Sequence, residues 1–189
     1  MIPAALVGTG LVLAVLSNAG PRNNTSVQSS IDGNIYQVQN LPNKAEAANK
    51  LAELKQRLTK LIESYKEDPA SISDPRISIL VSRFNPNNFC ENDINADTTS
   101  YSENKGEKIV VCLREKSPPY NFVDDNTIMF VLLHEMSHLM TTTIGHTPEF
   151  WANFKRILHD GVRCGIYTAV NYSKQPTPYC GMTITDSPI

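Results

Sequence analysis

The chain of 189 residues carries 17 lysine and arginine residues against 19 aspartate and glutamate residues, a formal net charge of −2. With 41% hydrophobic and 19% charged residues, it has the composition of a globular protein, which excludes a fibrous or wholly disordered chain. The near-neutral charge gives no general positive field, so we do not expect nucleic acid as a partner.

An apolar segment opens the chain. Residues 2–16 (IPAALVGTGLVLAVL) are uncharged, and the first charged residue is Arg22. Because a membrane span needs about 20 apolar residues, we interpret residues 1–19 as a short signal-anchor that associates the protein with a membrane. One alternative is a signal peptide cleaved near Ala19, which would make the protein secreted, and another is a buried segment.

The next residues predict a tether followed by a helix. Residues 20–40 are rich in polar residues and glycine, which favours a flexible polar tether and a folded domain that begins near Leu41. Apolar residues from Ala47 to Tyr65 recur every three or four positions and predict an amphipathic helix that ends before Pro69. Residues 43–46 (NKAE) resemble a capping box. We expect this helix to pack on the outside of the domain.

Two short apolar runs, Ile77–Val81 and Ile109–Leu113, predict β-strands. Between them, Thr98–Ser102 favours a strand and Asn104–Gly106 favours a turn, so an antiparallel hairpin should lead into the second run. We therefore expect a small antiparallel or mixed sheet in an α+β fold. The strand Ile109–Leu113 is predicted to border a cleft and to pair with an extended peptide.

The residues that indicate chemistry lie in a predicted helix over residues 126–142, which contains the sequence HEMSH. His134 and His138 are four positions apart, so both imidazoles project from one face of the helix and can hold a single Zn²⁺. Glu135 supplies the acid of the H-E-x-x-H pattern. Catalytic zinc lowers the pKa of a water molecule, and a neighbouring carboxylate can take its proton and pass it to the leaving amine.

Catalytic zinc sites use three protein ligands and keep one position for water. His146 comes directly before a second predicted helix, over residues 148–160, and we predict it as the third ligand. Glu149 in the first turn of that helix, and His159 or Asp160 at its far end, are the alternatives. The predicted function is a zinc metallopeptidase with one Zn²⁺ per chain and Glu135 as general base. A non-catalytic, zinc-stabilised binding or scaffolding module at a membrane is the alternative.

The four cysteines, Cys90, Cys112, Cys164 and Cys180, contain no C-x-x-C pair, so a structural zinc site built from them is poorly supported. An even number permits two disulfides without requiring them, and Cys164 with Cys180 is one candidate pair. Tyrosines near residues 167–179 are interpreted as packing groups, and none is assigned to catalysis.

The sequences HEMSH (134–138) and GHTPEFW (145–151) resemble the small zincin-like metallopeptidases of the SprT and WLM groups. The segments TTSYSENKG…VVCLREK and GIYTAVNYS…YCG resemble WLM-related proteins of large DNA viruses. The resemblance implies a zincin-like peptidase domain within residues 41–189, with His134, His138 and His146 as zinc ligands and Glu135 as general base. Cellular members that cut DNA-crosslinked proteins carry DNA-binding appendages, whereas this chain has an apolar N-terminus, so a role in DNA repair is not expected.

Overall fold

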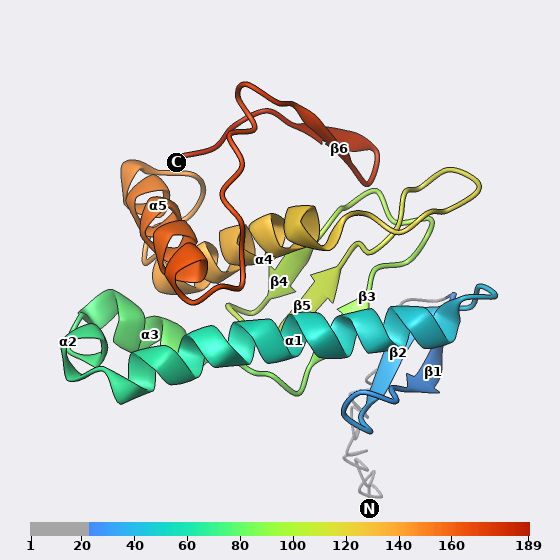
Figure 1. Cartoon of the computed structure of the whole chain (residues 1–189), viewed down its shortest axis with the longest axis horizontal. Helices are drawn as coiled ribbons and strands as arrows, with labels where there is room; N and C mark the ends of the chain where they lie inside the picture. Colours follow the sequence, from blue (N-terminus) through green and yellow to red (C-terminus); the bar gives the residue numbers. More distant parts are fainter. Residues whose placement is uncertain (1–22) are drawn as a thin grey trace, which may run out of the picture.

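The computed structural model describes residues 23–189 and has a mixed α+β architecture (Figure 1). The apolar run at residues 2–16 lies outside the described residues. Within residues 23–189, none of the helices combines the length and the hydrophobicity that a transmembrane span requires.

Seven strands and five helices make up the described part of the chain. The strands are β1 (Asn24–Gln28), β2 (Ile35–Gln39), β3 (Phe89–Glu91), β4 (Tyr101–Glu103), β5 (Lys108–Val111), β6 (Thr177–Tyr179) and β7 (Met182–Ile184). The helices are α1 (Lys44–Glu67), α2 (Pro69–Ile72), α3 (Pro75–Arg83), α4 (Asp125–Met140) and α5 (Pro148–Arg163).

The main sheet is mixed and has the strand order β1-β2-β3-β5-β4. Strands β2, β3 and β5 run parallel, while β1 and β4 are antiparallel to their neighbours. The predicted hairpin is confirmed as β4 and β5, with Tyr101 opposite Val110. Strand β5 is paired on both sides, so the expectation that it pairs with a substrate is wrong, and β4 forms that edge of the sheet.

Helix α1 confirms the predicted amphipathic helix, but it belongs to the core rather than to the outside. Its apolar stripe, including Leu51, Leu54 and Leu58, is fully buried, and the helix packs against β2, β3 and α3. The predicted capping box does not form, because the side chain of Asn43 makes no capping hydrogen bond.

The predicted tether at residues 20–40 is wrong for residues 24–39, which form the β1–β2 hairpin. The folded domain therefore begins well before Leu41. Tyr36 and Val38 alternate into the core, which is the two-residue period of a half-buried strand. The polar residues that suggested a tether lie at the edge of the sheet and form hydrogen bonds there. Asn24 Nδ2, for example, donates to the carbonyl oxygen of Glu91 at 2.6 Å.

The strand predicted at Ile77–Val81 is also wrong, because these residues lie in helix α3. Asp74 accepts a hydrogen bond from the backbone N–H of Arg76, and Pro75 occupies the first turn. These are helix-start signals. Ile77 and Leu80, three positions apart, are buried, as expected for one face of a helix.

Helices α4 and α5 confirm the two helices predicted around the histidines. Asp124 caps α4 by accepting from the N–H of Thr127 at 2.9 Å. Thr147 caps α5 by accepting from the N–H of Phe150 at 3.4 Å, with Pro148 in the first turn. The two helices pack against each other, so residues at the end of α4 face residues at the start of α5.

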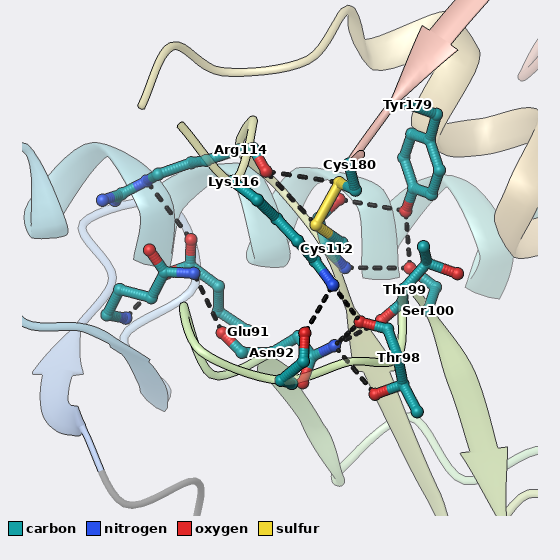
Figure 2. Close-up of a disulfide and its surroundings, with 12 residues drawn as sticks. Glu91, Asn92, Thr98, Thr99, Ser100, Cys112, Arg114, Lys116, Tyr179 and Cys180 are labelled. Carbon is teal, nitrogen blue, oxygen red and sulfur yellow. Dashed lines mark hydrogen bonds and ion pairs between the residues drawn. A yellow bond between two sulfur atoms is a disulfide. The ribbon is translucent and has the colours of Figure 1, made fainter. Parts of the chain in front are cut away.

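The disulfide joins Cys112 to Cys180, so the candidate pair Cys164–Cys180 is wrong (Figure 2). Cys180 lies in the turn between β6 and β7, which is held next to the end of β5. Cys164 lies at the end of α5 beside α1, where its Sγ is 3.3 Å from Ser64 Oγ. Its thiol is free, as is that of Cys90.

Candidate metal centre

The three histidines predicted as ligands lie together at the junction of α4 and α5. The Nε2 atom of His134 is 3.2 Å from that of His138 and 3.1 Å from that of His146. One ligand atom from each residue lies within 4.8 Å of the others. The i, i+4 spacing on α4 brings the first two imidazoles together, and the loop before α5 brings the third.

These separations fit one metal ion. Two nitrogens bound to Zn²⁺ at 2.0–2.1 Å in a tetrahedral arrangement lie about 3.3 Å apart, close to the separations found here. Burial, together with the neighbouring His138 and His146, lowers the pKa of His134 to about 3. The imidazole is therefore neutral at physiological pH, which is the form that binds a metal.

Phe150 supports all three histidines, a contribution that the sequence analysis missed. It is fully buried, and its ring centroid lies 4.8 Å from that of His134, 4.4 Å from that of His138 and 4.6 Å from that of His146. No contact between Phe150 and the histidines was predicted from the sequence. Phe150 lies four residues after His146, and this spacing was the signal in the sequence that could have indicated the contact.

Glu149 fixes the loop that carries His146. Its carboxylate accepts hydrogen bonds from the backbone N–H groups of Thr142 at 3.0 Å and Thr143 at 3.2 Å. These bonds hold the pKa of Glu149 at about 2, below its ordinary value of 4.5. Glu149 is thus engaged with the loop and is not part of the histidine cluster.

The two other alternative ligands lie away from the cluster. His159 is exposed near the end of α5. Asp160 is buried and accepts from the hydroxyl of Tyr65 at 2.8 Å and from Nε of Arg156 at 2.7 Å. Both its oxygens are occupied, since Arg163 donates to the second one.

Glu135 lies beside the histidines with its carboxylate almost completely buried. Its Oε2 accepts a hydrogen bond from the backbone N–H of Ser102 on β4 at 3.1 Å. Burial raises the pKa of Glu135 to about 7, and the bond from Ser102 partly opposes this shift. The edge strand therefore holds the carboxylate in place, a contact that no pattern in the sequence predicts.

A cavity of about 350 Å³ opens onto His134, Glu135 and His146. It is lined by residues of helices α4 and α5, by residues 99–100 and by residues 182–186. Tyr179, at the end of β6, is buried and donates from its hydroxyl to the carbonyl oxygen of Cys112 at 3.0 Å. Because this hydroxyl is engaged with the sheet, Tyr179 positions the hairpin.

Comparisons with known proteins identify relatives of this chain. Residues 82–175 match the family described as the WLM domain. The uncharacterized protein R325 of Acanthamoeba polyphaga mimivirus is 30% identical over 185 residues, which cover 97% of this chain and 93% of that protein. The uncharacterized protein 136R of invertebrate iridescent virus 6 is 30% identical over 119 residues, which cover 62% of this chain and 64% of that protein.

A similar fold occurs in a solved structure, that of Wss1 from Saccharomyces cerevisiae. The two folds superpose with a TM-score of 0.52 at 20% sequence identity, over 68% of this chain and 87% of the chain in that crystal structure. At this level of identity the similarity concerns the fold.

Proposed function

The chain belongs to the WLM family and is related to proteins of large DNA viruses, and from this premise we propose that it is a zinc metallopeptidase that cuts protein substrates. The observation that carries the proposal is the cluster of three imidazole nitrogens within 4.8 Å of one another, beside a buried glutamate. The cluster borders a cavity, so a polypeptide has access to it.

The donor set supports zinc. The imidazoles of His134, His138 and His146 would hold the ion, and such a set with one open position is typical of catalytic zinc. When bound, Zn²⁺ supplies Lewis acidity, which lowers the pKa of water and polarises a carbonyl group. Phe150 packs against the three rings and restricts their orientations.

Glu135 is the proposed general base. The backbone N–H of Ser102 donates to Oε2 of Glu135. This contact fixes the orientation of the whole carboxylate group, including its second oxygen. In the proposed reaction, Glu135 takes a proton from the attacking water and delivers it to the leaving amine nitrogen as the peptide bond breaks. General acid and base catalysis of this kind contributes roughly 10² to 10⁴ in rate.

The alternative is a non-catalytic, zinc-stabilised binding module. Structural zinc sites are usually closed by four protein ligands. Within residues 23–189, the cluster around His134 has three, which favours the enzyme.

We also propose that residues 2–16 associate the protein with a membrane. The uncharged apolar run motivates this proposal, and cleavage near Ala19 would instead give a secreted protein. Fractionation of the full chain, compared with a chain that starts at Asn23 and so keeps β1, tests it. Equal amounts of the two chains in the membrane fraction would contradict the anchor.

The test of the enzyme proposal measures zinc content and hydrolysis of an unfolded protein by the wild type, Glu135→Gln and Glu53→Gln. Glu53 is exposed on α1 and serves as the matched control. We expect about one zinc per chain in all three proteins, and activity lost only in Glu135→Gln. Equal activity in wild type and Glu135→Gln would remove Glu135 from the mechanism, and inactive wild type with bound zinc would favour the binding module.

A further inference from the structure

The cavity next to the histidines has an aromatic side that extends away from the three imidazole rings. Phe130 lies on α4 one turn before His134, and Phe154 lies on α5. Both rings are buried, with their centroids 5.1 Å apart, and the centroid of Phe154 is 5.2 Å from that of His134. This side of the cavity is therefore apolar and directly continuous with the proposed catalytic centre.

Trp151 forms the rim of the same side. Its ring centroid lies 6.2 Å from that of Phe154 and 6.1 Å from that of His146. Trp151 is 37% exposed, so part of its apolar surface is open to the solvent at the cavity. An apolar group that entered the cavity would cover this surface.

The opposite wall comes from residues 182–186, which include Met182 and Ile184. Figure 1 shows the chain returning from the hairpin of β6 and β7 to an end beside α5. The disulfide between Cys112 and Cys180 and the hydroxyl of Tyr179 attach the start of this segment to the sheet (Figure 2). The wall lies beyond residues 82–175, the part of the chain that matches the WLM family.

The size and charge of the cavity restrict what it can bind. A volume of about 350 Å³ is at the lower end of the range for ligand pockets, so it suits one bulky side chain rather than a folded partner. Among residues 23–189, no lysine or arginine lines the cavity, and the carboxylates that line it are those of Glu135 and the exposed Asp186. An acidic side chain in the aromatic part of the cavity would therefore meet no lysine or arginine side chain.

We propose that this cavity is a specificity pocket, which receives a large apolar side chain, aromatic or aliphatic, from a residue flanking the bond that is cut. The inference rests on the proposed peptidase function and adds the substrate class. Trp151 and Phe154 contact the side chain from one side, and Met182 and Ile184 from the other. Because burial of such a side chain is favourable, we expect roughly a 10- to 100-fold preference over serine.

The first test measures binding without catalysis. Trp151 is the only tryptophan in the chain, so its fluorescence reports on this cavity alone. Blocked tripeptides Gly-X-Gly, with X as Phe, Leu, Ser or Asp, are titrated into Glu135→Gln protein. We expect a saturable change in emission for Phe and Leu at concentrations where Ser and Asp give none.

Two exposed apolar residues provide a matched pair of variants in the same background. Met182 is 50% exposed and lines the cavity, whereas Ile35 is 69% exposed on β2 and does not. Because both are exposed, neither substitution is expected to unfold the protein. Met182→Asp should weaken binding of the Phe peptide at least several-fold, and Ile35→Asp should leave it unchanged.

The second test maps the cuts that the wild type makes in an unfolded protein by mass spectrometry. We expect Phe, Tyr, Leu and Met to be enriched at one fixed position next to the cut, and Trp151→Ala to reduce this enrichment. Cleavage without enrichment, or equal binding of the Phe and Ser peptides, would overturn the specificity pocket while the peptidase stands. Selective binding of the Phe peptide without any cleavage would uphold the pocket and overturn the peptidase.

Discussion

Removal of the disulfide should destabilise the protein by an amount that follows from its position in the chain. Cys112 and Cys180 are 68 residues apart, so the bond closes a large loop in the unfolded chain. The chain-entropy relation gives about 4 kcal/mol for a loop of this length, and measured losses are typically 2–4 kcal/mol. We expect a loss in this range for the double variant Cys112→Ala and Cys180→Ala.

Urea unfolding of metal-free protein, followed by circular dichroism, measures this loss without a contribution from zinc. With an m-value of about 2 kcal/mol/M, the midpoint should fall by roughly 1 to 2 M. Reduced wild type separates the bond from the change of side chains, and should unfold near the double variant. Cys164→Ala, which removes a free thiol, is the control and should stay near the oxidised wild type.

Equal midpoints for oxidised and reduced wild type would refute the reasoning. Such a result would mean that the bond does not limit the unfolded chain, or that it does not form. Thiol titration of the unfolded wild type distinguishes the two cases, because two free thiols are expected with the bond and four without it.

Three further outcomes are expected from single substitutions. His146→Ala should lower the zinc content well below one per chain, while Glu149→Ala should keep about one zinc per chain, as measured by elemental analysis after dialysis. The reverse result would assign the third ligand to the Glu149 carboxylate. The pKa of Glu149 is lower in the folded protein than its ordinary 4.5, so its carboxylate stabilises the fold above about pH 4.5. The difference in free energy of unfolding between metal-free wild type and Glu149→Gln should therefore shrink as the pH falls toward about 3. Gly106→Ala places a Cβ 2.5 Å from a backbone oxygen at a φ of +102°, and it should lower the free energy of unfolding by about 2 to 3 kcal/mol. Gly33 has a φ of +72° but open space around it, so Gly33→Ala should lower it by about 1 kcal/mol in the same urea assay. Equal losses in the two variants would contradict the steric explanation.

The parts of the fold that the sequence predicts well are those whose signals are local. Helix α5 begins where Thr147 and Pro148 indicate, and the turn at residues 104–106 joins β4 to β5. The proximity of His134 and His138 follows from the geometry of one helix, and that of His146 from a short capped loop. Each of these predictions depends on residues within 12 positions of one another in the chain.

Other predictions failed where one pattern fits two structures. The run Ile77–Val81 is short enough to fit a strand or a helix, and the preceding Asp74 and Pro75 favoured the helix. The polar composition of residues 24–39 fits a linker, but it also fits a hairpin at the edge of a sheet, where half of the side chains remain in water.

Contacts between distant segments left no signal in the sequence. The spacing of four cysteines does not determine the pairing of Cys112 with Cys180. The amide of Ser102 meets Glu135 only because β4 lies at the edge of the folded sheet, and the cavity wall at residues 182–186 exists only once the hairpin is attached.

The cavity wall at residues 182–186 and the three histidines belong to different parts of the chain. The histidines lie inside residues 82–175, which match the WLM family, whereas residues 182–186 lie outside them. Substitutions in the wall can therefore arise without any change to the three histidines. Under the proposed function, substitutions in residues 182–186 would change which side chains the cavity accepts while the histidines that would hold zinc stay in place.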